Sequence, residues 1–373
     1  MPLLTYAQAR PWAKAIRQSV TLRKMPPWFA DPKFGHFSND PSLTAAEIAT
    51  IQAWADSGAP QGLKEGAPAP VEWSDARTLP GANMEFGMTR PFPVPARKTI
   101  EYQYIVLRPG FAKDTWVREI QIRPSDRSVV HHAVLYVREP GSKWLENVPA
   151  GEAYQPPEDS ADRFITEDVL AVYAPGAPVM LCPEGMAKKI PAGSDLVLQM
   201  HYTSKGADAK DQTRISMIAS GEVPHARLMT LQMANYNLRI LPGERNQRVS
   251  VSGTLPQDAL LVSLFPHMHL RGSGFEYQLD HGHGQVDTLL KVNDYNFYWQ
   301  LSYQLKTPLP LKAGTRLVWN AWYDNSSANP RNPDPDAEVT WGGQSNEEMM
   351  VGFFDVAVSP DVDKKAFFIR QLQ

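Results

Sequence analysis

Six residues have the types and the spacing to hold metal ions: two adjacent histidines, a lone histidine, a second histidine pair and a methionine. They are His131, His132, His201, His267, His269 and Met349. Imidazole binds copper in both oxidation states, and a thioether is a soft ligand that favours Cu(I). The first three lie in one strand-like part of the sequence and the other three in the next. This split favours two redox-metal sites on two β domains over one structural zinc site.

The two histidine pairs differ in what their spacing predicts. His267 and His269 stand two apart in a strand-like run, so both imidazoles project from one face and can share a metal. The alternative is a pair of surface histidines or of satisfied core histidines. The neighbours His131 and His132 would point to opposite faces of a regular strand, so sharing a metal requires a β-bulge or a strong twist. On spacing alone, a structural role is the better interpretation of that adjacent pair.

The remaining candidates carry little signal by themselves. A lone strand histidine such as His201 is usually a core or surface residue, and Met349 in SNEEMMVGFF is of a type that ordinarily fills cores. His281 and His283 repeat the H-x-H spacing, but the run DHGHGQ is typical of a solvated turn. Spacing therefore leaves both metal sites as hypotheses.

Length, charge and composition fit a soluble multidomain β protein. The chain has 373 residues, 33 prolines and 24 glycines, which suits a turn-rich β protein better than a helical bundle. Its net charge of −3 gives no electrostatic case for binding nucleic acid or an anionic membrane. No apolar run is long enough to span a bilayer, and the start MPLLTYAQAR lacks the signal-peptide pattern. A single cysteine, Cys182, excludes an intramolecular disulfide.

The first quarter of the chain is predicted to be helical and then irregular. Two helices are expected in residues 1–62. The second begins with a capping box formed by Thr44 and Glu47, and Gly58 follows its end. Residues 63–94 are rich in proline and glycine, which predicts a linker or an extended strap across another domain.

From about residue 98 the hydrophobic period changes to two. The strand candidates are KTIEYQYIVL, WVREIQIR, VVHHAVLYV, DLVLQMHYT, RVSVSG, LLVSLFPHMHL, FEYQL, FYWQLSYQL, RLVWNAWY and VGFFDV. Many short strands between proline and glycine turns predict a mainly β fold with two tandem antiparallel β-sandwich (jelly-roll-like) domains. The expected domains are 95–223 and 224–373, with their border near GEVPHAR.

Four separated motifs stand in a fixed order over about residues 95–360. They are VVHHAVLYV, APGAPVMLCPEGMAKKIPAGSDLVLQMHYTSKG, FPHMHLRGSGFEYQL and GGQSNEEMMVGFF. Together they resemble the copper type II, ascorbate-dependent monooxygenase family, which includes the peptidylglycine α-hydroxylating and dopamine β-monooxygenases. The contexts Q-x-H-Y and H-x-H-x-x-G are part of the resemblance. Both domains of that family are antiparallel β-sandwiches, which agrees with the independent period-two pattern.

The resemblance implies one copper in each domain, and so two per chain. The implied ligands of the first, electron-storing copper are His131, His132 and His201. The implied ligands of the second copper, where dioxygen is activated, are His267, His269 and Met349. Met349 rather than Met350 is the match, because the family pattern is an acidic pair followed immediately by the ligand.

Departures from the family pattern bear on the substrate. The peptide-amidating relatives hold a substrate carboxylate with an arginine, an asparagine and a tyrosine. The matching positions of this chain are Phe265, Val351 and Phe353. The resemblance therefore implies a substrate pocket for a more apolar molecule, unless the three are ordinary core residues after a local shift. Gln199 matches a glutamine near the first copper of those relatives, so it either supports that site or is a strand residue that faces water.

The resemblance also implies the reaction and its partners. A C–H bond of a small organic substrate would be hydroxylated with dioxygen and an external reductant of the ascorbate type, or an electron-donor domain. A periplasmic or secreted location is expected from the family, although the chain carries no signal-peptide pattern. One alternative is a non-catalytic copper-binding or electron-transfer protein with the same sites. Another is a β-sandwich binding protein whose histidines are incidental.

Residues 1–62 resemble the C-terminal half of a small c-type cytochrome domain, through LLTYAQARPWAKAI, MPPW and ADSGAPQG. The attachment signature C-x-x-C-H is absent, so no covalent haem is expected in this chain. If Met1 is internal to a longer protein, an upstream haem-binding half and an export signal are expected, with Met25 as an axial ligand. The simpler interpretation, which we prefer for this chain, is that Met25 and Trp28 pack the helices.

Overall fold

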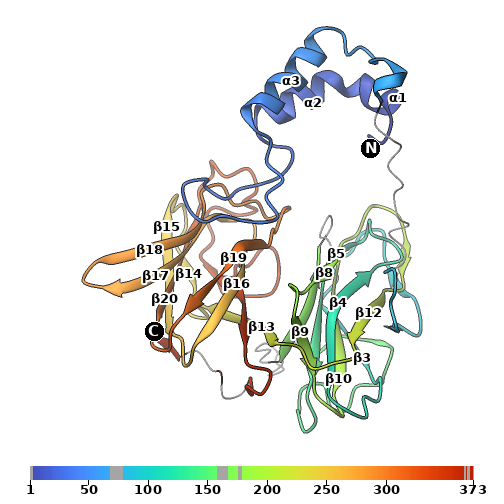
Figure 1. The fold of residues 1–373 in the computed structure, drawn as a ribbon, viewed down its shortest axis with the longest axis vertical. Coiled ribbons are helices and arrows are strands. Elements are labelled where there is room, and N and C mark those ends of the chain that lie inside the picture. Colours follow the sequence, from blue (N-terminus) through green and yellow to red (C-terminus); the bar gives the residue numbers. More distant parts are fainter. Residues whose placement is uncertain are drawn as a thin grey trace.

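The protein is mainly β with a short helical segment at its N-terminus, as the sequence predicted (Figure 1). A computed structural model describes residues 3–67, 79–157, 167–174, 179–364, 367 and 370–372. The strands form two β-sandwiches that lie side by side, and the helices lie at one end of the molecule (Figure 1). Within the described residues, no helix is long and apolar enough to cross a membrane.

The helical segment follows its sequence signals closely. Its elements are α1 Tyr6–Ala9, the 3-10 helix η1 Arg10–Trp12, α2 Ala13–Thr21, α3 Ala45–Asp56 and the short 3-10 helix η2 Lys64–Gly66. The predicted capping box is present at α3. The Thr44 hydroxyl accepts from the Glu47 amide at 3.2 Å, and the Glu47 carboxylate accepts from the Thr44 amide at 2.8 Å. Gly58 follows the helix with a φ of +88°, a left-handed conformation that suits glycine.

The first sandwich packs an antiparallel layer against a five-stranded sheet. One layer is β1 Met84–Gly87, β12 Arg214–Ser220, β4 Thr115–Arg123 and β9 Met186–Ile190, with β8 Met180–Leu181 beside β4. The other is β6 Ala153–Tyr154, β3 Gln103–Leu107, β10 Asp195–Tyr202, β5 Val130–Arg138 and β7 Asp168–Tyr173. Two further strands, β2 Phe92–Val94 and β11 Ala209–Asp211, pair with each other. Inward-facing aliphatic side chains of both layers form one buried core.

The second sandwich has the same plan. One layer is β13 Ala226–Ala234, β22 Val351–Val358, β16 Ala259–His267 and β19 Tyr303–Leu311. The other is β18 Gln285–Val292, β17 Gly272–Gly282, β20 Arg316–Tyr323, β15 Gln247–Thr254 and β23 Arg370–Leu372. A small pair, β14 Arg239–Ile240 and β21 Val339–Thr340, lies outside them. The core is aromatic at its centre, where the Trp319 ring contacts the rings of Tyr277 at 4.5 Å and Phe354 at 5.6 Å between centroids.

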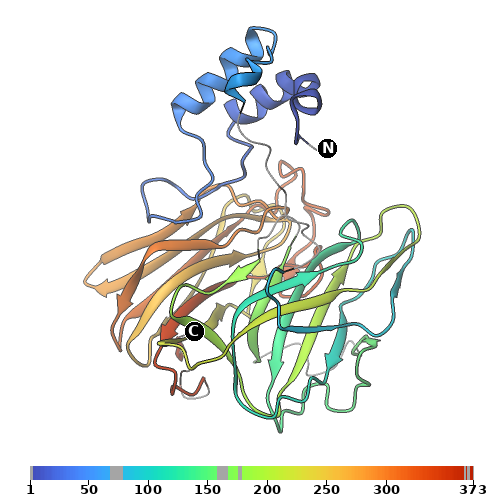
Figure 2. The same ribbon diagram turned by 45° about the vertical axis from the view of Figure 1, so that its right-hand side comes forward.

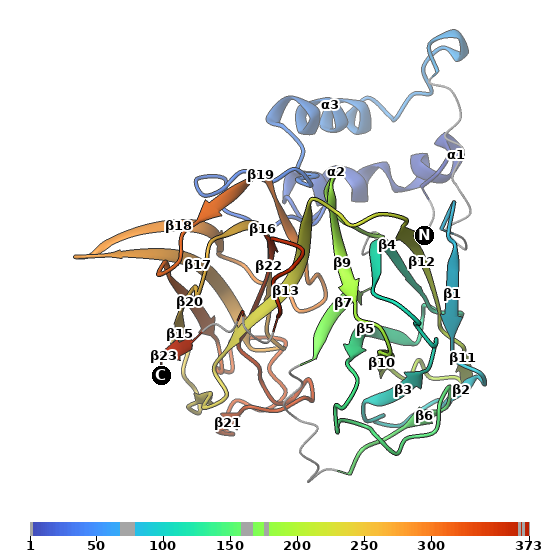
Figure 3. The same ribbon diagram turned by 60° about the horizontal axis from the view of Figure 1, so that its bottom comes forward.

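The two sandwiches share one continuous sheet. β9 of the first pairs in parallel with β13 of the second, through Met186 with Ala226 and Ala187 with Arg227 (Figure 3). The predicted border at 223/224 lies in the connection between β12 and β13. The stretch 63–94, predicted to be a linker, contains β1 and β2, and β1 pairs with β12 of the first sandwich. Because β9 and β13 pair in this joint sheet, one edge of the first sandwich lies directly beside one edge of the second.

An irregular strap connects α2 to α3 and crosses the second sandwich (Figure 2). Its backbone forms isolated bridges from Ala30 to Val292 and from Phe37 to Leu305. The Trp28 ring lies 4.8 Å from the Tyr303 ring, between centroids. Trp28 therefore packs against the β-sandwich, not between helices as the sequence suggested.

Two predicted strands are only half formed, and in KTIEYQYIVL the strand β3 begins at Gln103. FYWQLSYQL was expected to be a strand throughout, but β19 begins at Tyr303. Before it, the Asn296 side chain accepts a hydrogen bond from the Tyr298 amide at 3.0 Å. Such side chain–backbone bonds offer the chain a turn in place of strand pairing. The turn leaves Phe297 and Gln300 free to reach the candidate metal centres described below.

Cys182 is buried in a small cluster with Leu228, Val262 and Ala357 of the joint sheet, and burial raises the pKa of its thiol to about 11. Because only the thiolate reacts, we expect a disulfide reagent at pH 8 to modify the native chain about 100-fold more slowly than the guanidinium-unfolded chain. The native rate should still rise as the pH approaches 11. A rate at pH 8 equal in the two states would contradict the burial of this thiol.

Candidate metal centres

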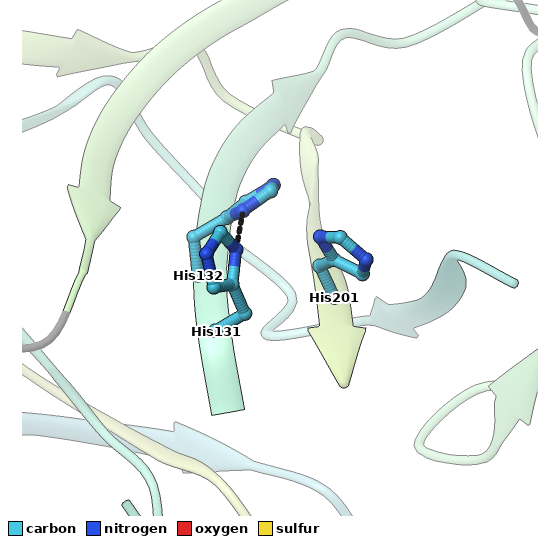
Figure 4. Close-up of side chains that lie close together, drawn as sticks. All are labelled: His131, His132 and His201. Carbon is cyan, nitrogen blue, oxygen red and sulfur yellow. Dashed lines mark hydrogen bonds between the residues drawn. The ribbon is translucent and has the colours of Figure 1, made fainter. Parts of the chain in front are cut away.

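Three histidines of the first sandwich converge on one point (Figure 4). His131 and His132 lie on β5 and His201 lies on β10, and one nitrogen of each ring lies within 4.8 Å of the others. In the pairing of β10 with β5, His201 stands opposite His132, but the next residue, Tyr202, stands opposite Val130. His131 is thus the extra residue of a β-bulge. The bulge is the feature that the sequence required for two adjacent histidines to face one metal.

The surroundings keep these imidazoles uncharged. Burial, and then the neighbouring histidines, hold the pKa of His132 well below its usual value, and burial lowers the pKa of His201 to about 4. The Nδ1 atoms of His131 and His132 lie 3.2 Å apart, a hydrogen-bond distance at which one ring donates to the other. Among the residues that the structure describes, no group bonds to the buried His201 Nδ1. Neutral imidazoles with free lone pairs are the form that binds metals, so this donor set fits a copper ion.

The second histidine pair lies where β16 ends. The rings of His267 and His269 lie 5.3 Å apart between centroids and nearly perpendicular, at 87°. His267 Nδ1 lies 2.6 Å from Gln300 Oε1, and His269 Nδ1 lies 3.2 Å from the carbonyl oxygen of Glu347. Because a carbonyl oxygen only accepts, each Nδ1 carries the proton and each Nε2 keeps its lone pair. Burial lowers the pKa of both rings, to about 3 for His269.

Met349 lies beside this pair. Sheet register pairs His267 with Val351, two residues after Met349. The amides of His269 and Met349 both donate to Glu348 Oε2, at 2.8 and 3.3 Å. Met349 is half-buried and lines the same cavity as His267. The backbones that carry the two kinds of ligand are therefore adjacent, and the role of the sulfur as third ligand stays a prediction.

Both histidine sets open on one cavity of about 1380 Å³ between the sandwiches. Residues of both sandwiches line it, including His131, His132, His267 and Met349. The three residues that the resemblance identified as a substrate pocket, Phe265, Val351 and Phe353, also line it. The rings of Phe265 and Phe353 lie 5.8 Å apart between centroids, which makes this wall apolar beside the second pair.

Gln199 also lines the cavity, two residues before His201 on β10. It is buried, and its amide nitrogen donates to the Tyr104 hydroxyl at 2.7 Å. The interpretation of Gln199 as a strand residue that faces water is therefore wrong. Its support of the first site remains a prediction, and its partner in the structure is Tyr104.

One aromatic ring contacts both sets. The Phe297 ring stacks on His131 at 5.0 Å and 24°, and lies 6.0 Å from His269, between centroids. On the other side of the first set, the Tyr102 ring lies 4.8 Å from His201. The two histidine sets are thus separated by side chains as well as by the open cavity.

The exposed pair His281 and His283 is not part of either set. It lies at the turn between β17 and β18, where His281 Nε2 contacts Asp287 at 2.9 Å. Both histidines are exposed as predicted, but the turn itself is only His283 and Gly284, because β17 extends to Gly282. His283 has a φ of +54°, as is common at the tip of a hairpin.

Several residues of the centres were missed by sequence reasoning: Tyr102, Phe297, Gln300 and Glu348. Phe297 and Gln300 lie in a run interpreted as strand, and the Asn296 turn was the only local signal against it. Glu348 stands directly before a candidate ligand, which was the signal that could have identified it.

Sequence comparisons with known proteins found no relative of this chain. No family model matches the chain, and no curated protein matches it. Among solved structures, the infectious bursal disease virus VP2 subviral particle has a TM-score of 0.21 and 8% identity, over 78% of this chain and 75% of that one. The infectious bursal disease virus Gt strain structure has a TM-score of 0.15 and 11% identity, over 82% of this chain and 79% of that one. Neither likeness is close enough to describe the fold or the function.

Proposed function

We propose that the protein is a copper-dependent monooxygenase that hydroxylates a C–H bond of an apolar organic molecule, using two mononuclear copper sites. One observation carries the proposal: of two sets of neutral imidazoles, one from each sandwich, His131, His132 and His267 line a single cavity. A thioether beside neutral nitrogen donors suits copper, whereas zinc sites take their ligands from histidine, carboxylate and thiolate. Copper supplies one-electron redox chemistry and dioxygen binding when it is bound.

The chain's own groups would orient the ligands and receive the substrate. Gln300 and the Glu347 carbonyl hold the Nδ1–H groups of His267 and His269, which leaves each Nε2 for the metal. Phe265 and Phe353 give the cavity an apolar wall beside this pair. The cavity exceeds the roughly 300–1,000 Å³ of sites for drug-sized ligands, so it can hold a bulky substrate.

The reaction takes R–H, dioxygen, two electrons and two protons to R–OH and water. The substrate does not supply the two electrons, so an external donor of the ascorbate type, or an electron-donor domain, must. A periplasmic or secreted location belongs to the same proposal.

The proposal is tested with copper-loaded protein, ascorbate and isotopically labelled dioxygen. We expect two coppers per chain, and labelled alcohol from an alkylbenzene such as ethylbenzene, but not from a peptide with a C-terminal glycine. The apolar wall is the reason for this preference. Two bound coppers without labelled product from a series of alkylbenzenes would favour the electron-transfer alternative. A chain that binds no copper would favour a binding protein with incidental histidines.

A further inference from the structure

One carboxylate joins the methionine to the histidine pair. Glu348 is fully buried, and both of its oxygens accept backbone hydrogen bonds. Oε1 accepts from the Arg271 amide at 2.6 Å, and Oε2 accepts from the amides of His269 and Met349 at 2.8 and 3.3 Å. Two of the three donors, His269 and Arg271, belong to the H-x-H-x-x-G segment, and the third belongs to the proposed sulfur ligand itself.

Such a group is costly to keep in a protein interior. A buried carboxylate loses its hydration, and hydrogen bonds and a nearby positive charge must offset the loss. Arg271 supplies that charge while it is itself almost fully buried. Its guanidinium donates to Asn325 Oδ1 at 2.7 Å and to the Asn346 carbonyl at 2.8 Å. Arg271 thus holds the loop before Met349, and Glu348 holds the loop at Met349.

The backbone at Glu348 and Met349 is fixed from several directions. The Glu348 amide donates to the Thr340 carbonyl at 3.3 Å, and the Glu348 carbonyl accepts from the Gly342 amide at 3.1 Å. The Tyr323 hydroxyl donates to the Met349 carbonyl at 2.8 Å. With its backbone held in this way, Met349 has only side-chain rotation left to lose when a metal binds, so the site is preorganised.

We infer that Glu348 is a positioning residue that sets the Met349 sulfur at the metal held by His267 and His269. This inference rests on the proposed function, because it assumes that the metal is copper. The buried carboxylate of Glu348 then determines the spacing between the Met349 sulfur and the two imidazoles. The three-histidine site of the other sandwich does not depend on it.

The test compares Glu348→Gln with a matched control, Glu276→Gln. The amide of Glu348→Gln has one acceptor in place of two, so at least one of the three backbone donors loses its partner. Glu276 is also a buried glutamate of the second sandwich, and its carboxylate lies 3.5 Å from the Lys291 ammonium. X-ray absorption of the Cu(I)-loaded protein reports the sulfur neighbour, and competition with a Cu(I) chelator reports affinity.

In wild type and Glu276→Gln we expect a copper–sulfur distance in the absorption spectrum. In Glu348→Gln we expect that sulfur signal to be lost and Cu(I) affinity at the second site to fall about 10- to 100-fold, with the three-histidine copper retained. A Glu348→Gln protein with the sulfur signal and affinity of wild type would overturn the inference. A wild type without any sulfur signal would instead count against the proposed function, which separates the two failures.

A second measurement covers the case in which Glu348→Gln does not fold. Amide hydrogen exchange on the metal-free wild type reports directly whether the three donors are held. We expect the amides of His269, Arg271 and Met349 to exchange much more slowly than that of the exposed Asn346. Exchange of the Met349 amide as fast as that of Asn346 would overturn the inference without any variant.

Discussion

Replacement of Met349 with isoleucine is expected to abolish hydroxylation while the three-histidine site keeps its copper. Isoleucine fills a similar volume but offers no sulfur, so the second site is left with two imidazoles and loses its preference for Cu(I). Loss of an outer hydrogen-bond partner costs a metal site 10- to 100-fold, so loss of a ligand should lower turnover by at least about 100-fold. Product formation with ascorbate and the paramagnetic resonance of the remaining Cu(II) measure the two effects separately.

The neighbouring residue provides the control. Met350 is fully buried in the core of the second sandwich, so Met350→Ile makes the same change one residue away. This variant is expected to keep its second copper and its turnover, apart from a small loss of stability. Full activity in Met349→Ile would refute its role as a ligand. Loss of the second copper in Met350→Ile alone would show that the wrong methionine had been identified.

Local signals predicted the parts of the protein whose structure is decided locally. The capping box at Thr44 and Glu47 is formed within four residues, so it could be predicted without knowing any contact distant in sequence. Period-two patterning predicted the mainly β fold, because alternating side chains face a core whichever strands pair. The exposed turn after His281 could also be predicted locally, because Gly282 and Gly284 flank His283.

The arrangement of the candidate sites depends on pairing that the sequence does not specify. Adjacent histidines face one point only because His131 is bulged out of register with β10. That register is decided by strands about 70 residues apart in the sequence. The contact of Phe297 with both histidine sets requires the Asn296 turn and the packing of the two sandwiches together. Sequence motifs could suggest which residues bind metal, but not which ring would lie between them.

The joint sheet bears on how the two proposed sites are related. β9 and β13 belong to different sandwiches yet exchange backbone hydrogen bonds. Near this junction, the Arg227 guanidinium on β13 lies 3.4 Å from the Asp168 carboxylate of β7, and both side chains are buried. Breaking a buried ion pair is strongly destabilising, so this pair resists separation of the sandwiches. The two histidine sets are therefore held on a common frame and not on freely hinged domains.

Replacement of His201 with alanine should remove the copper of the three-histidine site in the first sandwich. The three imidazoles of the first sandwich lie within 4.8 Å of one another at their ligand atoms, so the variant keeps two of the three donors. We expect copper content to fall from two to one per chain, and turnover with ascorbate to fall by at least about 100-fold. The Cu(I) of the second site should retain its sulfur neighbour, because Glu348 and Met349 belong to the other sandwich. Copper analysis and X-ray absorption of the same sample measure both quantities.

His283→Ala is the matched control, since it removes an exposed imidazole at the tip of the hairpin between β17 and β18. It is expected to leave copper content and turnover unchanged. Together, His201→Ala and Met349→Ile should each lose one site and keep the other, although both lose hydroxylation. If His201→Ala kept two coppers and full turnover, the first histidine set would be structural and hydroxylation would need only one site. If it lost both coppers, the two sets would form one cooperative centre, and the assignment of independent sites to the two sandwiches would be wrong.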